Sequence, residues 1–381
     1  MRVAALSNIH LSIDIGTSSI KAVLVNENGF ILKKRVNKLP IIFNGGAAEH
    51  DLEALLNILR ECLTSIVKGF EKSIESIAFD SYMHALAVLA NDLTVIQNPM
   101  LHLDTRSSPS QASIKDWSKQ LYDRTGCPPL FIYPIVKVIW LKQQKKLKDV
   151  SKFSFVKDYL LNKLFGHWCV DYGVASGTGL FNVHDLKWDD LALEIAGISE
   201  SKLPDLVEGS RILDYVSLKE FGVEGKVALI PGTFDGAAQN IGLSAYDLRG
   251  ALNLGSTLVV RLLKKQLTMD HDPRMRFFAY YAADGYFAIG GASNNGMTAL
   301  EWIRSNVLGN RDWKEIDSEA GDIKPGSEGV MVFPFVAGER FPFRDPKLRL
   351  EIMRLALWNN WRHIARASFE GVSYIAKTMV K

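Results

Sequence analysis

A strand-like stretch near the start of the chain carries a carboxylate where strands rarely have one. Residues 11–25 read LSIDIGTSSIKAVLV, an apolar alternation that is interrupted by Asp14 and followed by a turn of Gly16, Thr17 and Ser18. Aspartate is disfavoured in strands, and a buried carboxylate is costly unless it has a partner. The stretch therefore predicts a strand, a tight turn and a second strand, and it indicates a functional role for the carboxylate.

The same pattern returns in the second half of the sequence. ALNLGSTLVVRLLK, residues 251–264, repeats the order of apolar strand, polar residue, glycine, small hydroxyl residues and apolar strand, with Asn253 in place of the aspartate. Two such units far apart in the chain predict two related domains, each with one glycine–hydroxyl turn. We predict a boundary near SAYDLRG, so that the domains comprise residues 1–243 and 244–381.

The rest of the sequence alternates between strand and helix patterns. NENG (26–29) marks a hairpin, residues 51–70 have apolar positions at helical spacing, and residues 361–380 predict the last helix. LIPGTFDGAAQNIG (229–242) predicts a strand, a glycine-rich loop and the start of a helix, with Asp235 just before that helix. This mixture of strands and helices indicates an α/β fold.

Length and charge narrow the class of protein. With 381 residues the chain is long enough for two or three domains with cores of their own. The net charge of +3 is too weak to indicate a nucleic-acid partner. The basic clusters KKRVNK (33–38) and KQQKKLK (142–148) lack interleaved aromatic residues, and we interpret both as solvated faces.

Cysteine usage and hydropathy indicate the compartment. Cys62, Cys127 and Cys169 are far apart and odd in number, which fits neither a disulfide framework nor a metal site. No apolar run approaches the ~18 residues that a membrane span needs, and the first residues lack a secretory signal pattern. We therefore expect a cytoplasmic protein without a membrane partner.

The two predicted turns offer chemistry that suits phosphate groups. Glycine lets the backbone come close to a ligand, and backbone N–H groups together with small hydroxyls hold phosphate oxygens. Asp14 could hold Mg²⁺, because hard oxygen ligands suit this ion and it commonly bridges nucleotide phosphates. The alternative is a plain hairpin in which local N–H groups satisfy Asp14.

Asp235, in the stretch GTFDGAAQNIG, allows two interpretations. It follows a predicted strand and precedes the expected helix, where it could act as a general base that takes a proton from a substrate hydroxyl. Aspartate is also a favoured N-cap residue of helices. The two roles are compatible, so the cap does not exclude the base.

Taken in order, these motifs resemble those of the FGGY carbohydrate kinases, part of the sugar kinase, Hsp70 and actin superfamily. DIGTSSIKAVL and NLGSTLVV are similar to the two phosphate motifs of the family, and GTFDGAAQNIG is similar to the loop with its catalytic aspartate. YMHALAVL (82–89) and HLDTRSS (102–108) resemble its substrate-side motifs, and residues 326–346 resemble the signature region of its second domain. The resemblance implies an α/β fold of two ribonuclease-H-like domains around a central cleft.

The resemblance also implies roles for individual residues. It implies ATP-dependent phosphorylation of a sugar, with Asp235 as the catalytic base and with Asp14 and Asp235 as ligands of Mg²⁺. The positions that match the substrate side are Met83, His84, Asp104, Arg106 and Gly236. The positions that match the nucleotide side are Gly16, Thr17, Ser18, Lys21, Gly255, Ser256, Thr257, Gly290, Gly291 and Asn295.

Several details resemble the gluconate kinase branch more than the xylulose or glycerol branches, above all GGASNNG (290–296). The expected substrate is then D-gluconate, phosphorylated at its terminal hydroxyl to 6-phosphogluconate. An anionic sugar acid needs a cationic partner, and Arg106 suits this role better than Lys137 or Lys157, which could be surface charges. His84 could bind a sugar hydroxyl or be a satisfied core histidine.

The sequence also departs from the family pattern. Tyr82 stands where glutamine is usual, His102 where tryptophan is usual, and Ser256-Thr257 reverses the usual order. The family continues after the last helix with a strand and a glycine-rich loop that holds adenosine, so we expect a second domain that is incomplete at its C-terminus. These departures leave open a xylulose- or glycerol-kinase-like enzyme and an inactive sugar-binding relative, whereas the substrate-side motifs argue against a chaperone-like or filament-forming protein. The resemblance is compatible with a homodimer.

Overall fold

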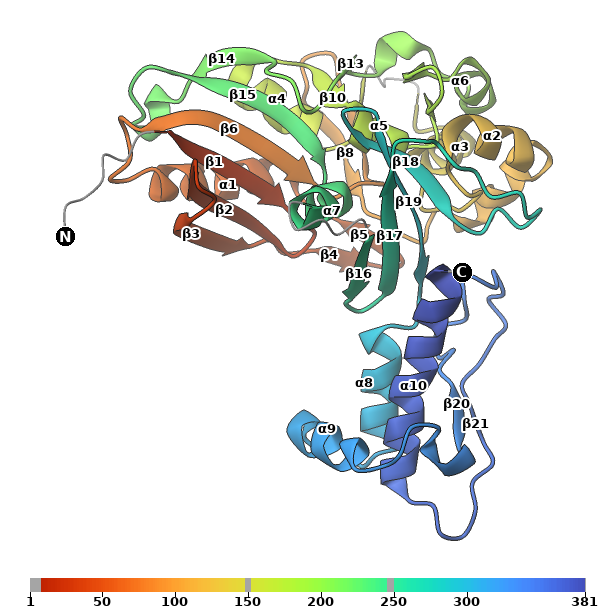
Figure 1. Ribbon diagram of the computed structural model, residues 1–381. Coiled ribbons are helices and arrows are strands. Elements are labelled where there is room, and N and C mark those ends of the chain that lie inside the picture. The colour runs from red at the N-terminus through yellow and green to blue at the C-terminus, as the bar shows by residue number, and fades with distance from the viewer. Residues whose placement is uncertain (1–7, 148–151, 245–249, 381) are drawn as a thin grey trace, which may run out of the picture. The chain divides into compact units, whose positions relative to one another are not determined.

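The computed structural model describes residues 8–147, 152–244 and 250–380 (Figure 1). Contacts between residues divide the chain into two compact units. Unit 1 comprises Met1–Gly242, Lys265–Leu267 and Ala279–Phe287, and unit 2 comprises Leu243–Lys264, Thr268–Phe278 and Ala288–Lys381. The predicted boundary falls largely on residues 245–249, which lie outside the described residues. The two domains expected at 1–243 and 244–381 therefore stay a prediction.

A six-stranded sheet forms the centre of unit 1, in the order β14-β15-β6-β1-β2-β3 (Figure 1). β1 lies parallel to β6 and antiparallel to β2, and β6 lies parallel to β15. Along β1 every second side chain is buried, because successive residues of a strand point to opposite faces of the sheet. The strands are β1 Ile9–Ile15, β2 Ser19–Asn26, β3 Ile31–Lys38, β6 Ile74–Ser81, β14 Asp214–Ser217 and β15 Lys226–Phe234.

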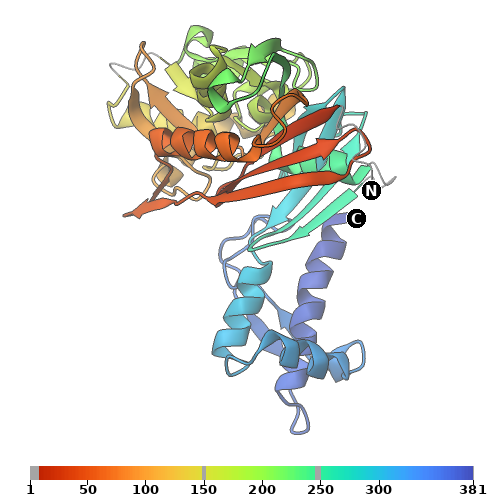
Figure 2. The same ribbon diagram turned by 90° about the vertical axis from the view of Figure 1, so that its left-hand side faces the viewer.

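Helix α1, Leu52–Ile66, packs against this sheet (Figure 2). The helix begins where the side chain of Asp51 accepts a hydrogen bond from the N–H of Ala54 at 3.0 Å, which satisfies one of the unpaired donors of the first turn. Its buried residues recur at the spacing of one helical face and join the strand residues in one hydrophobic cluster. The sequence pattern of residues 51–70 predicted this helix, and the structure confirms it.

Unit 1 has a second, five-stranded sheet in the order β4-β5-β8-β7-β9. Its strands are β4 Ile42–Asn44, β5 Ala47–Glu49, β7 Leu86–Leu89, β8 Val95–Met100 and β9 Lys152–Ser154. The short strand pairs of the unit are β10 Cys169–Asp171 with β13 Asp205–Val207, and β11 Phe181–Asn182 with β12 Lys187–Trp188. Its other helices are α2 Ser118–Thr125, α3 Pro134–Gln143, α4 Lys157–Phe165, α5 Tyr172–Ser176, α6 Asp190–Ala196 and α7 Asp235–Ser244. Its 3₁₀ helices are η1 Ser108–Trp117, η2 Glu200–Lys202 and η3 Lys219–Phe221.

A four-stranded sheet follows in the order β16-β17-β19-β18. Its strands are β16 Gly250–Leu254, β17 Leu258–Lys264, β18 Phe278–Ala283 and β19 Tyr286–Ser293. The helices of unit 2 are α8 Met297–Asn306, α9 Trp313–Gly321 and α10 Trp361–Val380, with the 3₁₀ helix η4 Ser327–Gly329 and the strand pair β20 Met331–Phe333 and β21 Glu351–Met353. Side chains from all three α-helices and from β20 meet in one hydrophobic cluster, which holds this part of unit 2 together.

The structure confirms the α/β fold, the NENG hairpin between β2 and β3, and the last helix, α10. The prediction of a glycine-rich loop before Asp235 is wrong, because β15 continues to Phe234 and joins α7 directly. A register shift between Ile230 and Thr233 accommodates the glycine of this stretch within the strand. Within the described residues, we find no helix that is long and apolar enough to span a membrane.

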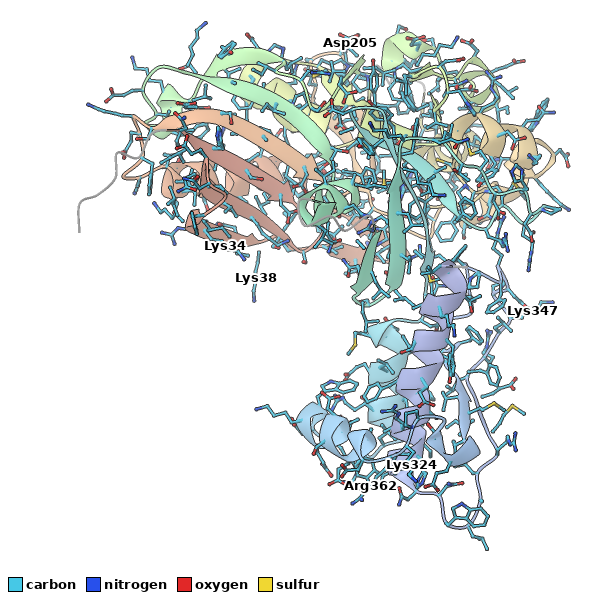
Figure 3. The ribbon with its side chains drawn as sticks, in the orientation of Figure 1. Lys34, Lys38, Asp205, Lys324, Lys347 and Arg362 are labelled. Atoms are coloured by element: carbon cyan, nitrogen blue, oxygen red, sulfur yellow. The ribbon has the colours of Figure 1, made fainter. Side chains whose placement is uncertain are left out.

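The basic cluster at residues 33–38 lies on β3, an edge strand of the six-stranded sheet. Lys34 and Lys38 are exposed and point into solvent (Figure 3). Residues 142–146 of the second cluster are exposed as well. Both observations confirm the interpretation as solvated faces, apart from Lys33, which donates to the carbonyls of Ser65 and Lys68. Lys148 lies outside the described residues.

Candidate active site

The first glycine–hydroxyl turn joins β1 to β2 and places Asp14 beside Lys21. The two residues are directly opposed in the antiparallel pair, and Lys21 Nζ donates to Asp14 Oδ2 at 2.5 Å. The turn closes through the N–H of Gly16, which donates to the carbonyl of Ser19 at 3.0 Å. Because both charged side chains are partly exposed, the ion pair contributes about 1 kcal/mol or less. Asp14 therefore has a local partner, but that partner is an ammonium group rather than the N–H groups considered from the sequence.

Asp80, near the end of β6, is a second carboxyl group beside Asp14. The two residues are register partners on parallel neighbouring strands, and their side chains share a hydrogen bond. Burial raises the pKa of Asp80 to about 8, and the negative charges of Asp14 and Asp235 act in the same direction against the opposing charge of Lys157. A hydrogen bond between two carboxyl groups needs one proton between them. The sequence reasoning missed Asp80, although an aspartate within the apolar strand IESIAFDS was a signal of the same kind as Asp14.

These carboxyl groups bear on the expected magnesium ion. Among the described residues no cluster of three histidine, cysteine or acidic side chains could hold a metal ion by itself. Mg²⁺, however, is usually held by one or two carboxylates together with substrate phosphates. The adjacent Asp14 and Asp80 offer such oxygens, and a cation beside them would offset the burial and the negative charges that raise the pKa of Asp80. The residues therefore fit an ion that binds together with a nucleotide.

Asp235 is the first residue of α7, and its side chain is exposed. Its Oδ1 accepts the N–H of Gly236 at 2.6 Å. Thr233, two residues earlier on β15, is the register partner of Asp80, which in turn is the partner of Asp14. β1, β6 and β15 run parallel, so their carboxyl ends bring the three aspartates to the same end of the six-stranded sheet. Ligands of α/β proteins commonly bind at the carboxyl ends of the strands.

Met83 and His84 follow β6 and pack against Gly177. His84 has a positive φ of 69°, a conformation that costs a residue other than glycine about 1–3 kcal/mol. Its Nδ1 lies 2.8 Å from the carbonyl oxygen of Gly177, so Nδ1 carries the proton and donates. The ring also makes edge contacts with Tyr133 and Tyr280. In the neutral ring Nε2 is consequently an acceptor, which suits a substrate hydroxyl.

We expect Gly177→Ala to weaken sugar binding with little loss of stability. A Cβ at this position would lie 2.2 Å from Cε of Met83 and 3.2 Å from the ring of His84, and the flexible end of Met83 can move aside. Displacing both side chains should raise KM for the sugar by roughly 10- to 100-fold. Steady-state kinetics measure this, with Gly321→Ala as the control, since a Cβ there meets nothing within 4 Å. An unchanged KM for the sugar would mean that Met83 and His84 do not contribute to sugar binding.

Arg106 is already paired with carboxylates. Its guanidinium donates to both carboxylate oxygens of Asp104, at 2.6 to 3.1 Å, and also to Glu49, and it lies over the ring of Trp140. Asp104 is fully buried and also accepts the N–H groups of Ala48 and Arg106. One cation between two carboxylates has no net positive charge to offer. The expectation that Arg106 neutralises the carboxylate of a sugar acid is therefore not supported, and Asp104 acts by orienting Arg106.

A chain of hydrogen bonds links the first turn to the substrate-side segment. His50 is fully buried, with Nε2 3.0 Å from the carbonyl oxygen of Thr17 and Nδ1 2.7 Å from the hydroxyl of Tyr82. Because a carbonyl only accepts, Nε2 carries the proton and Nδ1 accepts from Tyr82. Tyr82, which departs from the family pattern, thus has a partner in His50, and neither residue was among the predicted site residues.

We expect His50 to make the protein less stable at acidic pH. Burial lowers the pKa of His50 below its ordinary 6.5, so the unfolded chain takes up a proton before the folded one does. Stability from this group is lost as the pH falls below 6.5 toward the lowered pKa, at most about 1.4 kcal/mol per pH unit. Urea unfolding between pH 5 and 8 should show a shallower pH slope in His50→Gln, which keeps one donor and one acceptor. Equal slopes in both proteins would contradict this assignment.

The two lysines interpreted as possible surface charges are fully buried instead. Lys137, on α3, donates to three backbone carbonyls, and burial lowers its pKa to about 7. Lys157, the first residue of α4, pairs with Asp171 at 2.6 Å and donates to the carbonyl of Thr233 at 2.9 Å. Both ammonium groups are thus held by the protein, so neither is available as the partner of a sugar acid.

The second glycine–hydroxyl turn, in unit 2, joins β16 to β17. The N–H of Gly255 donates to the carbonyl of Thr257 at 3.0 Å, so this turn is one residue shorter than the first. The N–H groups of Met297 and Thr298, at the start of α8, donate to the carbonyls of Gly255 and Ser256. A Cβ on Gly296 would lie 2.6 Å from the carbonyl oxygen of Gly255, so glycine is needed for this close approach.

Three other residues expected on the nucleotide side have packing roles. Gly290 and Gly291 lie within β19, where a Cβ would lie 2.0 Å from the carbonyl oxygen of Val260 or 2.5 Å from the ring of Phe341. Asn295 is fully buried, donates to Gly338 and Glu339, and accepts from Ala337. These contacts explain why the residue types occur there without any ligand.

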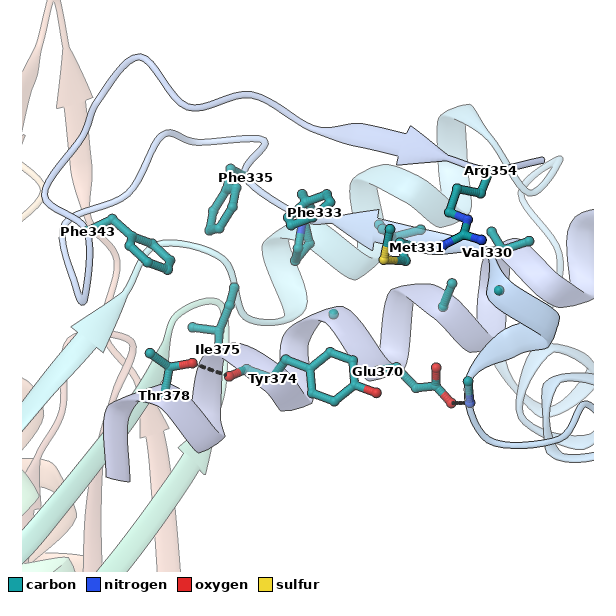
Figure 4. Close-up of a pocket in the computed structure, with 16 residues that line it drawn as sticks. Val330, Met331, Phe333, Phe335, Phe343, Arg354, Glu370, Tyr374, Ile375 and Thr378 are labelled. Atoms are coloured by element: carbon teal, nitrogen blue, oxygen red, sulfur yellow. Dashed lines mark hydrogen bonds between the residues drawn. The ribbon is translucent and has the colours of Figure 1, made fainter. Parts of the chain in front are cut away.

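A pocket of about 470 Å³ lies in unit 2 between α10 and β20 (Figure 4). Phe333, Phe335, Phe343 and Tyr374 line it together with a few polar groups such as Glu370. It contains none of the residues that the sequence predicted for a site. Its lining is mostly apolar and offers no arrangement for phosphoryl chemistry.

The chain belongs to the FGGY family of carbohydrate kinases. The N-terminal domain of the FGGY family of carbohydrate kinases matches residues 9–242, which contain the first turn, the substrate-side residues and Asp235. The enzyme is accordingly a carbohydrate kinase, a phosphotransferase with an alcohol group as acceptor.

Within this family, the chain is similar to gluconate kinases and xylulose kinases. The gluconokinase of Bacillus subtilis (strain 168) is 31% identical over an alignment of 391 positions, gaps included, which covers 97% of this chain and 75% of that protein. The xylulose kinase of the same organism is 26% identical over 96% of this chain. The crystal structure of gluconate kinase from Lactobacillus acidophilus superimposes with a TM-score of 0.91 and 26% identity, over 98% of this chain and 78% of that one.

Proposed function

We propose that this kinase transfers the γ-phosphoryl group of ATP to D-gluconate and forms 6-phosphogluconate. The arrangement of Asp235 beside Asp14 and Asp80 at one end of the sheet supports phosphoryl transfer to a hydroxyl. The choice of gluconate rests on similarity to the gluconokinases, because Arg106 is already neutralised by its two carboxylates.

In this proposal Asp235 accepts the proton of the attacking hydroxyl, a step worth about 10²–10⁴-fold in rate. Each turn offers N–H and hydroxyl groups to phosphate oxygens. Asp14 with Asp80 would hold Mg²⁺, which when bound neutralises charge on the phosphates. His84 Nε2 accepts from a sugar hydroxyl, and the N–H groups of Arg106 donate to another. We leave Gly290, Gly291 and Asn295 out of the nucleotide set because of their packing contacts. A cytoplasmic location and a homodimer remain part of the proposal.

The test is an assay that couples ADP release to a measurable signal, with Mg²⁺ and ATP against gluconate, xylulose and glycerol. Turnover that depends on gluconate supports the proposal. Turnover only with xylulose or glycerol would mean that the kinase uses the same mechanism on that substrate and does not phosphorylate gluconate. Sugar binding by calorimetry without any turnover would instead identify an inactive sugar-binding relative.

A further inference from the structure

Lys137 joins two segments that are far apart in the sequence. Its ammonium group donates to the carbonyl oxygens of His84 at 2.6 Å, Met100 at 2.7 Å and Leu101 at 2.8 Å. An ammonium group has three donors, so all three are used. The side chain is 0% exposed, and it reaches these carbonyls from α3, on which it lies.

Each of the two segments carries residues of the proposed sugar site. The first contains Met83 and His84, and the carbonyl bound by Lys137 belongs to His84 itself. The second leads into Asp104, whose N–H donates to the carbonyl of Leu101, one of the acceptors of Lys137. Arg106 follows two residues later and is oriented by Asp104. One buried lysine side chain thus fixes the backbone of both groups of sugar-side residues.

The conformation of His84 makes this contact important. Its positive φ is disfavoured for histidine, so the surrounding contacts must hold it. Among these contacts, the ring donates to the carbonyl of Gly177, and Lys137 binds the backbone carbonyl of His84. Without the Lys137 side chain, the carbonyls of His84, Met100 and Leu101 lose this donor.

We propose that Lys137 is a positioning residue of this kinase, which holds segments 82–85 and 100–106 in register and thereby sets the affinity for the sugar. The inference rests on the proposed function, since it takes these segments as the sugar side of the site. Lys137 itself touches no substrate and contributes nothing to the chemical step. Its loss should therefore raise KM for the sugar and leave kcat and KM for ATP nearly unchanged.

The experiment compares Lys137→Met, Lys137→Gln and Lys142→Met in steady-state kinetics of the full chain. Lys142 is an exposed residue of the same helix and serves as the matched control. We expect Lys137→Met to raise KM for the sugar roughly 10- to 100-fold. Lys137→Gln, whose amide keeps two donors, should lie between Lys137→Met and the wild type, and Lys142→Met should match the wild type.

Three results would overturn this role. The positioning role would be excluded if a folded Lys137→Met variant had an unchanged sugar KM. It would also be excluded if kcat fell by 10- to 100-fold while KM stayed normal. Failure of both Lys137 variants to fold, judged by circular dichroism and urea unfolding, would assign the residue to overall stability instead. A wild-type enzyme that turns over no sugar would count against the proposed function and this inference together, whereas a normal KM in an active variant counts against the inference alone.

Discussion

Asp235→Asn should lower kcat by about 10²–10⁴-fold while leaving sugar binding largely intact. The amide has nearly the shape of the carboxylate, and its oxygen can still accept the N–H of Gly236, so α7 should begin as before. What it loses is the ability to accept a proton from the attacking hydroxyl. The measurement is ATP- and sugar-dependent ADP release, with sugar binding followed separately by calorimetry.

Asp205→Asn is the matched control for this substitution. Asp205 is an exposed aspartate of unit 1 on β13 (Figure 3), so its replacement should leave kcat and KM unchanged. Turnover of Asp235→Asn within a few-fold of the wild type would remove Asp235 from the chemistry. Loss of sugar binding together with turnover would indicate that the carboxylate binds substrate rather than accepting its proton.

Lys157→Met should destabilise the protein by about 3–5 kcal/mol. Lys157 and Asp171 are both 0% exposed and lie 2.6 Å apart, so removal of the cation leaves a buried carboxylate without its counter-charge. The substitution also removes the donor to the carbonyl of Thr233, two residues before Asp235. The midpoint of urea unfolding, followed by circular dichroism, should fall markedly, whereas Lys34→Met on the exposed face of β3 should not change it.

A double variant distinguishes charge from packing. Asp171 also caps α5, because its Oδ1 accepts the N–H of Val174 at 2.9 Å. Asparagine keeps this cap and removes the charge, so Lys157→Met combined with Asp171→Asn should be more stable than Lys157→Met alone. If the single variant lost less than about 1 kcal/mol, or the double variant were the less stable of the two, the buried pair would not be the cause.

Much of the fold could be predicted from local pattern. Period-two alternation in β1 and β2, the NENG turn and the 3.6-residue period of α1 are local signals, and the structure has each element where the sequence indicated it. The prediction of a loop before Asp235 was wrong for a physical reason. Glycine and proline suggest a turn, yet here Gly232 lies where a Cβ would meet the carbonyl oxygen of Phe79 at 1.6 Å, so the residue permits close packing of two strands.

The site could be predicted only where one motif contains the whole signal. Asp14, His84 and Asp235 each stand in a recognisable stretch, and the structure places Asp14 and Asp235 close to Asp80. Lys137 and Lys157 could not be interpreted correctly, because their acceptors lie far away in the sequence. Arg106 pairs with the neighbouring Asp104, but its second partner, Glu49, lies 57 residues away. Burial and pairing follow from tertiary packing, and a lysine next to other polar residues looks like a surface charge until its acceptors are known.

The three cysteines have a practical consequence for studying this kinase. All three are buried within unit 1, and burial raises the pKa values of Cys62 to about 11 and of Cys127 and Cys169 to about 12. At neutral pH they are unreactive thiols that an alkylating reagent reaches only when unit 1 opens. Because the sequence has no other cysteine, the labelling rate measures the opening of unit 1 alone, unaffected by any local unfolding of unit 2. Slower labelling with a sugar present would reveal ligand binding in an assay that requires neither turnover nor a fluorescent probe.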